Sequence, residues 1–445
     1  MLPTSKTALT SEEIFAFFTV KVTIQHRRET KLINLKMGKN GKFGKDYGKV
    51  VGKDSKGRPG WKGPGYVKKA EPPAKPKSAK EEKSDEVAVQ LLPLELQQLL
   101  LNVFRDAFYE LVTSDGLHSL LQIVKSALYE RDFTGAFGTG DNLEAYSVRW
   151  SPSRALCYAS ILVDLRQYLA AINLEPETRQ AKDNCPNSEI TDKSHSTLRV
   201  ASFGGGGAEV VAFGGLIRYL QGCITAKDAT EASSDDEEGG SSSLSISNQG
   251  MKIDLDLIDR ADWKTVVDKL YQGLISQPPL SKYASASARE ANLSLISAGS
   301  MTTQFRTEDV LELDLKQLST IVGQTPLLLT LLFTLNELYT TSITKTTTFL
   351  LNLTLATKPG TLLLVVDSPG SYSETTIGSE AKKYPMKFLL DHTLLEVEKT
   401  RGEETASNWE KVVSEDSQWF RLPECLRYPV TLENMRYQIH LYRRL

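Results

Sequence analysis

The sequence is poor in the residues that build metal and disulfide sites. Its 445 residues include only four cysteines and five histidines. The cysteines stand far apart and contain no C-x-x-C pair, which argues against a zinc site and against a disulfide framework. The histidines show no spacing typical of metal ligands. We therefore expect no bound metal, and we expect reduced thiols in an intracellular protein.

Long hydrophobic runs are also missing. The longest, Pro326–Leu335, is too short to span a bilayer. The N-terminus carries charges where a secretory signal would have an apolar core. We therefore expect no association with membranes. Hydrophobic residues make up 40% and charged residues 24% of the chain, as in ordinary globular proteins, and the length allows two to three domains.

Positive charge is concentrated near the N-terminus. Residues 39–69 contain ten lysines and arginines and two aspartates, although the whole chain has a net charge of −2. The same window holds eight glycines and four aromatic residues, so it cannot bury enough apolar surface to fold alone. Basic and aromatic side chains together favour RNA contact through phosphates and stacked bases. A solvated tail or a nuclear-import signal is the alternative.

Composition divides the chain into three parts. Residues 1–85 form a basic, largely disordered extension that ends in a Pro/Lys/Glu linker. Residues 86–195 begin with segments whose apolar residues have helical spacing, which predicts a helical subdomain. Residues 196–445 alternate strand and helix patterns. The sequence thus predicts an α/β domain with a parallel sheet, preceded by the helical subdomain and the disordered tail.

The expected strands of the α/β domain differ in how they are connected. The first five are separated by helical segments, whereas the last two follow each other closely, which favours an antiparallel pair at the end of the sheet. Their ranges are 198–203, 252–258, 301–305, 327–333, 361–366, 418–422 and 435–442. An acidic, Ser/Gly-rich stretch at 226–250 interrupts the alternation, and we expect it to be a disordered insertion.

The first expected strand runs into four consecutive glycines, Gly204, Gly205, Gly206 and Gly207. A strand, a glycine turn and a helix bring backbone close to a nucleotide-like cofactor in α/β folds, because a Cβ would block both the turn and the ligand. The dinucleotide fingerprint G-x-G-x-x-G needs a glycine at 209 or 210, where this chain has Glu209 and Val210. S-adenosyl-L-methionine is therefore a better candidate than a nicotinamide cofactor.

An acidic residue follows at the distance that such a site needs. Gly207 and Asp259 are 52 positions apart, and removing the 24 residues of Lys227–Gly250 leaves 28, about one strand–helix–strand unit. Asp259 then ends the second strand, where a carboxylate can accept hydrogen bonds from ribose hydroxyls. The alternative is that Asp259 caps a helix that starts near Ala261.

Two further positions complete the expected cofactor site. Trp263 is placed to pack on the adenine face. Asp309 or Glu308 follows the third strand, where an acidic side chain can bind the adenine amino group. A capping role for the next helix is the alternative for this acidic position.

Six stretches together resemble one family: RWSPSRALCYA, SFGGGGAE, LIDRADW, LLFTLNELY, VVDSPGSYS and YPVTLENMRYQIHLYRR. They resemble the fungal S-adenosylmethionine-dependent methyltransferases that modify N3 of a uracil in large-subunit (25S) ribosomal RNA. The resemblance covers about residues 90–445 without the acidic insertion. It implies a Rossmann-like class I methyltransferase fold and a role in ribosome biogenesis. The implied partner is ribosomal RNA or a pre-ribosomal particle, and the implied location is the nucleus or nucleolus, with the cytoplasm as a second location.

Methylation at uracil N3 requires removal of the N3 proton and access to the Watson–Crick edge of an unpaired or flipped base. Polar residues after the fourth strand are expected to face the transferred methyl group. Our hypothesis is that Asn336 orients the uracil edge and that Glu337 or Asp367 assists proton removal. The alternative is that Asn336 and Glu337 cap or solvate the next helix.

Some candidate RNA contacts and some competing functions stay open at this point. The arginines expected to reach RNA phosphates are Arg149, Arg154, Arg436, Arg443 and Arg444. For the first two, a structural role that locks the helical subdomain to the sheet is equally compatible. A catalytically idle RNA-binding assembly factor and a methyltransferase for proteins or small molecules are the competing functions. The intact glycine and acidic set argues against the first, and the basic aromatic window argues against the second.

Overall fold

A computed structural model describes residues 91–172, 197–231, 251–290, 292–370, 384–396 and 407–445. Contacts divide the chain into two units, residues 1–89 and residues 90–445, and the described residues all belong to the second. The basic window at 39–69 lies outside the described residues. The insertion at 226–250 was expected to be disordered, but its first residues, 226–231, form the end of a helix that runs from Gly207 to Glu231, so this part of the expectation is wrong. These residues include alanine, lysine and glutamate, which favour a helix, and residues 232–250 lie outside the described residues.

Seven strands form one sheet in the described part of the chain, in the order β3-β2-β1-β4-β5-β7-β6. The first five pair in parallel, and β7 pairs antiparallel with both β5 and β6. The α/β sheet with an antiparallel pair at its end is the one that the strand and helix patterns predict, and its order fits the Rossmann-like class I methyltransferase fold that the family resemblance implies. The strands are β1 (Thr197–Phe203), β2 (Lys252–Asp259), β3 (Met301–Thr307), β4 (Leu328–Leu332), β5 (Leu362–Asp367), β6 (Trp409–Phe420) and β7 (Met435–Arg444).

Burial along the strands follows their place in the sheet. Every residue of the central strands β4 and β5 is buried, as continuous apolar runs covered on both faces should be. The edge strand β3 is mostly exposed or half-buried. For β1 to β5 and β7, the expected ranges match the strands to within about two residues at each end.

The sequence-based range of β6 is wrong. The strand was expected at 418–422 but runs from Trp409 to Phe420. Its interior, KVVSEDSQW, is polar and lies at the exposed sheet edge, so it lacks the apolar alternation from which a strand is recognised. Two register shifts against β7 further break its pattern, as bulges on edge strands do. The antiparallel pairing with β7 is confirmed.

The residues before the sheet are helical, as predicted. Their helices are α2 (Leu94–Ala107), α3 (Tyr109–Val112), α4 (Leu117–Tyr129), α5 (Phe133–Phe137), α6 (Gly140–Arg149), α7 (Ser151–Asp164) and α8 (Arg166–Ile172). Helix α7 is buried on nearly all sides. These helices share one hydrophobic core with β1, β2 and the helices that follow them. Both predicted domain boundaries, 85/86 and 195/196, fall outside the described residues, so the division into domains stays a prediction.

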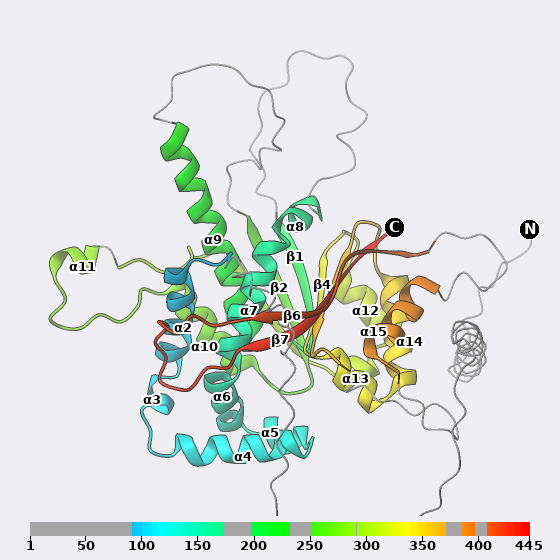
Figure 1. Cartoon of the computed structure of the whole chain (residues 1–445), viewed down its shortest axis with the longest axis horizontal. Coiled ribbons are helices and arrows are strands. Elements are labelled where there is room, and N and C mark those ends of the chain that lie inside the picture. The colour runs from blue at the N-terminus through cyan, green and yellow to red at the C-terminus, as the bar shows by residue number, and fades with distance from the viewer. Residues whose placement is uncertain (1–90, 173–196, 232–250, 291, 371–383, 397–406) are drawn as a thin grey trace, which may run out of the picture. The chain divides into compact units, whose positions relative to one another are not determined.

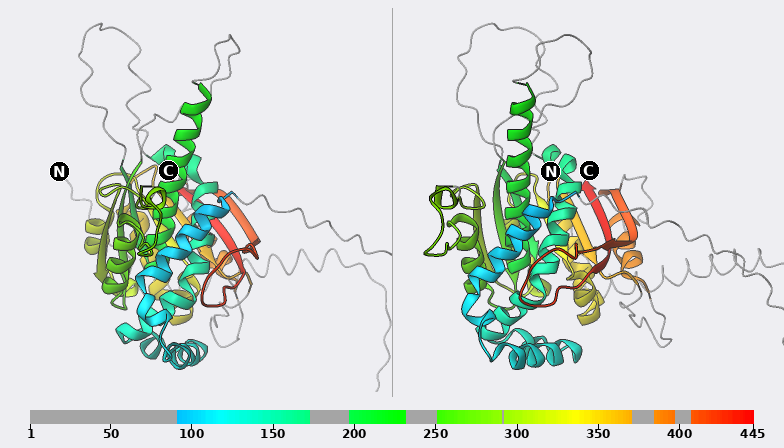
Figure 2. Two further views of the ribbon diagram at one scale, coloured as in Figure 1. Left: turned by 90° about the vertical axis from the view of Figure 1, so that its left-hand side faces the viewer. Right: turned by 60° about the vertical axis from the view of Figure 1, so that its left-hand side comes forward.

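The remaining helices cover the two faces of the sheet (Figures 1 and 2). Helices α2, α7, α9 and α10 lie on one side, and α12, α14 and α15 lie on the other. Polar caps fix several starts; Asp314 and Gln317, for example, form a capping box at α12. The elements are α9 (Gly207–Glu231), α10 (Lys264–Ile275), α11 (Ala286–Glu290), the turn η2 (Val310–Glu312), α12 (Leu315–Val322), α13 (Leu335–Thr341), α14 (Ile343–Ala356), α15 (Met386–Asp391) and the π-helical turn η3 (His392–Glu396).

Among the described residues, no single helix is long and apolar enough to cross a membrane. Helices α7 and α8 reach the required length and hydrophobicity only when taken together, and they are bent by 68° at their junction.

Candidate active site

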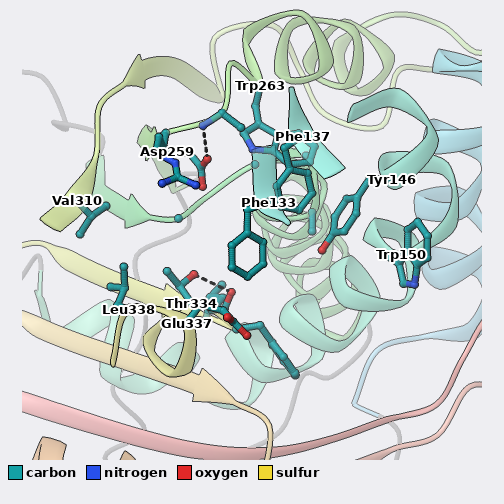
Figure 3. A pocket seen from close by; sticks show the side chains of 18 of the residues that line it. Phe133, Phe137, Tyr146, Trp150, Asp259, Trp263, Val310, Thr334, Glu337 and Leu338 are labelled. Carbon is teal, nitrogen blue, oxygen red and sulfur yellow. Dashed lines mark hydrogen bonds between the residues drawn. The ribbon is translucent and has the colours of Figure 1, made fainter. Parts of the chain in front are cut away.

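A cavity of about 690 Å³ lies at the carboxyl ends of the parallel strands (Figure 3). Its walls come from the residues that end or follow β1, β2, β3 and β4, and from helices α5, α6, α7 and α13. Ligands of open α/β sheets bind at this edge, where the strand order reverses between β1 and β4. The topology therefore marks this cavity as the candidate active site.

The glycine turn forms one wall of the cavity. Gly204 has a φ of 75°, a conformation that favours glycine, and a Cβ there would lie 2.4 Å from the Thr334 side chain. A Cβ on Gly206 would lie 3.1 Å from the Trp263 ring. Gly204, Gly206 and Gly207 line the cavity, whereas Gly205 packs against the β1–β2 side. The turn therefore exposes backbone to the cavity, as a cofactor site requires.

Asp259 stands at the carboxyl end of β2 and lines the cavity. Its Oδ1 accepts a hydrogen bond from the backbone nitrogen of Ala261 at 2.7 Å, and the side chain of Trp263 donates a second one. Burial raises the pKa of Asp259 to about 6, although both hydrogen bonds lower it. Asp259 therefore caps the local turn and also lines the cavity. It is placed for a contact with the ribose, which stays a prediction.

Asp309 stands next to Asp259, because the Glu308 nitrogen donates to the Asp259 carbonyl at 2.9 Å. Asp309 lines the cavity and Glu308 does not, so Asp309 is the one of the two that is placed to meet a ligand. Its Oδ1 accepts from the Leu311 nitrogen at 2.9 Å, so Asp309 also caps the turn η2. Val310 and Leu311 add apolar lining beside it. An acidic group next to apolar side chains suits an adenine, and this contact also stays a prediction.

Trp263 is buried, with 6% of its surface exposed. Its ring lies 5.6 Å from those of Phe137 and Tyr146, and the indole lies over Gly206. Together with the hydrogen bond to Asp259, this packing makes Trp263 a support for the glycine turn and for the acidic residue. The expected stacking on adenine stays a prediction.

An aromatic wall faces the glycine turn, and sequence reasoning missed it. Its members Phe133, Phe137, Tyr146 and Trp150 come from α5, α6 and the residue after α6, and Figure 3 shows them around one side of the cavity. Neighbouring rings are 5.1 Å apart for Phe137 and Tyr146, and 5.3 Å apart for Tyr146 and Trp150. In the sequence these residues have the spacing of an ordinary buried helix face, so nothing distinguished them from core.

The end of β4 carries an unusual backbone conformation. Phe333 has a φ of 57°, which is rare for a bulky residue and which clusters at functional sites. Its nitrogen donates to the Val366 carbonyl at 2.7 Å, and its side chain lines the cavity. The guanidinium of Arg154 lies 5.2 Å from the Phe333 ring. The turn thus presents an aromatic ring and the following polar residues to the cavity.

Asn336 and Asp367 form a buried pair behind the cavity wall. Asp367 accepts hydrogen bonds from the Asn336 backbone at 2.9 Å, from the Asn336 side chain at 2.6 Å and from the Ser368 backbone at 2.7 Å. Burial raises the pKa of Asp367 to about 6 against the effect of these donors. Neither residue lines the cavity. The geometry favours a positioning role, because their polar atoms are engaged with each other.

Glu337 differs from this pair because it lines the cavity. Within the part of the chain that the structure describes, its Oε2 is buried and has no hydrogen-bond partner. A buried carboxylate oxygen without a donor is costly unless a ligand supplies one. Of the two predicted proton acceptors, Glu337 is therefore the one placed to meet a substrate. Thr334, one of the polar residues that follow β4, lines the cavity as well.

Two charged groups occupy another part of the cavity lining, Arg154 of α7 and Glu209 of α9. Glu209 is buried, with 4% of its surface exposed, and its Oε2 accepts from the Gly206 nitrogen at 2.8 Å. Burial raises the pKa of Glu209 to about 7. Arg154 hydrogen-bonds to the Tyr146 hydroxyl and lies 5.5 Å from the Tyr146 ring. The sequence placed Arg154 in a family-like motif but gave Glu209 no role.

The other predicted phosphate-binding arginines lie elsewhere. Arg149 pairs with Glu433 and lies 5.6 Å from the Trp150 ring, which fits the structural alternative. Arg443 and Arg444 pair with the start of β5 and with residues at the opposite edge of the sheet from the cavity. Arg436 begins β7, near the cavity edge, and donates to the Ser417 hydroxyl at 2.9 Å. Phosphate contact by any of them stays a prediction.

Comparisons with known proteins agree with this geometry. A family model described as "Putative SAM-dependent methyltransferase" matches residues 104–443. The chain belongs to this methyltransferase family. It is 34% identical over 322 residues, 72% of this chain and 76% of the relative, to the Saccharomyces cerevisiae 25S rRNA (uridine(2843)-N(3))-methyltransferase.

Solved methyltransferase structures also match, at low identity. A SAM-dependent methyltransferase from Anabaena variabilis is 10% identical, with 75% of this chain and 96% of that chain covered, at a TM-score of 0.29. Human N-acetylserotonin methyltransferase in complex with SAM is 12% identical, with 70% of this chain and 58% of that chain covered, at a TM-score of 0.25.

The cavity of this methyltransferase fits its cofactor, S-adenosylmethionine. The glycine turn leaves backbone open, Asp259 offers a carboxylate for the ribose, and Asp309 with Val310 offers an adenine position. When bound, the cofactor supplies a methyl group activated by a sulfonium. Among the described residues, no group of three or more His, Cys, Asp or Glu side chains is arranged to hold a metal ion.

Proposed function

We propose that this methyltransferase transfers a methyl group to N3 of a uridine in large-subunit ribosomal RNA, during ribosome biogenesis. The observation that carries the proposal is the 34% identity, over 322 residues, to a yeast enzyme named for that reaction. The chemistry available in the cavity supports it, because N3 methylation needs a proton acceptor and space for an extruded base.

Glu337 is the proton acceptor in this proposal. Uracil N3 becomes nucleophilic only when its proton leaves, so the carboxylate takes that proton as the N3–methyl bond forms and the methyl–sulfur bond breaks. The buried Oε2 of Glu337, without a partner among the described residues, is available for it. Asp367 and Asn336 hold the first turn of α13 and thereby position Glu337, which follows Asn336 directly.

The aromatic wall provides a place for the base. N3 lies on the Watson–Crick edge, so the uracil must leave its pairing partner and its stack before it reacts. Phe133 and Phe333 are half-buried, line the same cavity as Glu337 and offer ring faces on which a flat base can stack. The base-binding side of the cavity is thus built from α5 and the end of β4, with the buried ring of Tyr146 behind it.

The finer aspects of the proposal concern the particle and its location. We propose a pre-ribosomal particle as the substrate and the nucleus or nucleolus as the place of action. The support is the large-subunit RNA in the name of the yeast relative, together with the basic window at 39–69, which suits phosphate contact.

Primer extension on large-subunit RNA tests the proposal. N3 methylation blocks base pairing, so reverse transcriptase should stop at one uridine in RNA from cells with the protein and read through in cells without it. Cells that carry only Glu337→Gln should also lack the stop. If the stop persists in cells without the protein, the uridine-N3 assignment is wrong. If the stop is lost without the protein but kept with a variant that binds no S-adenosylmethionine, the chain acts as an idle assembly factor.

A further inference from the structure

The cavity holds two opposite charges that do not pair with each other. Arg154 makes no ion pair with any described residue, and Glu209 makes none either. Both line the cavity and lie close enough for the charge of each to affect the other. Opposite charges confined together usually form a salt bridge, because an uncompensated charge is costly to hold away from water. Their separation calls for a ligand.

The surroundings of Arg154 leave its guanidinium turned to the cavity. Aromatic rings flank it, with Tyr146 at 5.5 Å and Phe333 at 5.2 Å, and the hydroxyl of Tyr146 takes one hydrogen bond. A guanidinium has several N–H groups and always carries its charge. Tyr158, one turn further along α7, also lies close enough to affect the charge of Arg154, and it is neutral near pH 7 because burial raises its pKa. A carboxylate is the group that best satisfies the remaining donors.

The surroundings of Glu209 call for a cation. One carboxylate oxygen accepts from the glycine turn, through the Gly206 nitrogen. This bond resembles half of a capping box at the start of α9, and it engages one oxygen of the Glu209 carboxylate. The charge itself is left without a cationic neighbour in contact. An ammonium group in the cavity would supply both the charge and the hydrogen-bond donors.

A single ligand of this enzyme carries both groups. The amino-acid end of S-adenosylmethionine is a zwitterion, with a carboxylate and an ammonium on one carbon. We propose that Arg154 binds the carboxylate and Glu209 the ammonium of this zwitterion. Asp259 and Asp309 would then hold the nucleoside at the ends of β2 and β3. Glu337, after the end of β4, would stand beside the methyl group; Asp259 and Glu337 lie on opposite sides of the cavity in Figure 3. This assignment depends on the cofactor and is independent of the RNA substrate.

This role for Arg154 replaces the phosphate contact expected from the sequence. Arg154 stands on α7, which is buried on nearly all sides, and its guanidinium lies between two aromatic rings. A ribosomal phosphate would have to enter the cavity beside the glycine turn to reach it. The amino-acid end of the cofactor, in contrast, has to lie near that turn.

Two nucleosides distinguish binding of the amino-acid end of the cofactor from binding of the rest of the molecule. S-adenosylhomocysteine carries the zwitterion, and 5′-methylthioadenosine keeps the adenine, ribose and sulfur without it. We would measure their affinities by calorimetry for the full chain and for Arg154→Gln and Glu209→Gln. Each variant should bind S-adenosylhomocysteine about ten- to a hundredfold more weakly and methylthioadenosine within about twofold of the wild type. Arg218→Gln, which changes an exposed arginine of α9, is the matched control and should change neither affinity.

Equal losses for both nucleosides would overturn the proposal, because they would show general damage to the cavity. Unchanged binding of S-adenosylhomocysteine would also overturn it. The carboxamide of S-adenosylhomocysteine tests the wild-type protein in case a variant does not fold: it should bind wild type about as weakly as Arg154→Gln binds the acid. A carboxamide that binds the wild type as tightly as the acid would remove Arg154 from this role. Methyl transfer to RNA enters none of these measurements, so the uridine-N3 proposal can fail while this one holds.

Discussion

Asn336 donates two hydrogen bonds to Asp367, from its backbone nitrogen at 2.9 Å and from its side chain at 2.6 Å. Together they join the end of β5 to the first turn of α13. An amide at position 367 could not accept at both oxygens, so Asp367→Asn would leave a buried donor unpaired. We expect a loss of about 1–3 kcal/mol in the free energy of unfolding, measured by urea denaturation.

The same substitution should also lower kcat, because Asp367 positions the residue next to Glu337. Asp262→Asn is the matched control, since Asp262 is exposed and caps only the Lys264 nitrogen. It should change stability by less than about 0.5 kcal/mol. A stable Asp367→Asn variant with wild-type kcat would contradict the positioning role.

Glu209 makes cofactor affinity depend on pH. Burial raises its pKa to about 7, so a part of the unliganded protein carries a neutral Glu209 at and below that pH. Only the ionised form can pair with an ammonium, so the Kd for S-adenosylhomocysteine should fall as the pH rises from 6 to 8. The groups facing Glu209 are Arg154 and Tyr158 of α7, Tyr146 of α6 and Asp259 of β2.

The Glu209→Gln variant distinguishes the contribution of Glu209 to the pH dependence from those of the other groups, because it removes the titration of Glu209 alone. Its Kd should lose much of the pH dependence, and what remains belongs to Asp259, whose pKa burial raises to about 6. The free energy of unfolding of the unliganded protein should decrease as the pH rises, whereas its affinity for the cofactor should increase. A folded-state pKa above the unfolded value gives stability that is present below about pH 4 and lost as the pH rises through 7. The wild-type protein should therefore lose stability relative to Glu209→Gln over that interval, measured by denaturation at each pH.

Gly204 and Gly222 are expected to respond in opposite ways to alanine. At Gly204 the φ of 75° and the 2.4 Å approach to Thr334 leave no room for a Cβ, so Gly204→Ala should destabilise the protein and weaken cofactor binding. Gly222 lies in α9 with nothing within 4 Å of its Cβ position. Gly222→Ala should raise stability by about 0.5–1 kcal/mol through helix propensity. Thermal unfolding with and without S-adenosylhomocysteine measures both, and a tolerant Gly204 would contradict the account of the turn.

The sequence predicted the parts of the site that depend on strand order. Gly204, Asp259 and Asp309 follow three parallel strands, and the carboxyl ends of such strands meet at one edge of the sheet, so their proximity follows from the pattern alone. The aromatic wall could not be predicted in this way. Phe137 and Tyr146 have the periodicity of core residues, and only the packing of α5 and α6 against the glycine turn shows that they face a cavity.

The sequence also could not assign separate roles to the polar residues at the ends of β4 and β5. Asn336, Glu337 and Asp367 were expected to act on the same substrate. In the structure, side-chain direction separates them: two pair behind the wall and Glu337 lines the cavity. Direction depends on where α13 begins, which Phe333 sets through its left-handed backbone. No local pattern marks a bulky residue for that conformation.

The basic window at 39–69 is expected to provide part of the affinity for RNA. Its ten lysines and arginines release counterions on binding, so deleting it should reduce the steepness with which log Kd depends on log salt concentration. Deleting residues 232–250 of the acidic insertion, which follow the end of α9, is the control and should leave the slope unchanged or steeper. The measurement is fluorescence anisotropy with a large-subunit RNA fragment at several salt concentrations. An unchanged slope after deletion of 39–69 would remove this segment from RNA binding.

Glu337→Gln is expected to slow methyl transfer while cofactor binding stays intact. The amide cannot accept the N3 proton, so kcat should fall by about 10²- to 10⁴-fold at neutral pH, with an unchanged Kd for S-adenosylhomocysteine. Uracil N3 loses its proton to solvent at alkaline pH, so the rate of the variant should recover toward the wild-type rate as the pH rises. Glu312→Gln is the matched control, because it changes an exposed carboxylate that pairs with Lys345. It should leave kcat and the pH dependence of kcat unchanged. A variant at position 337 that stays slow at every pH would show that Glu337 orients the base instead of accepting its proton.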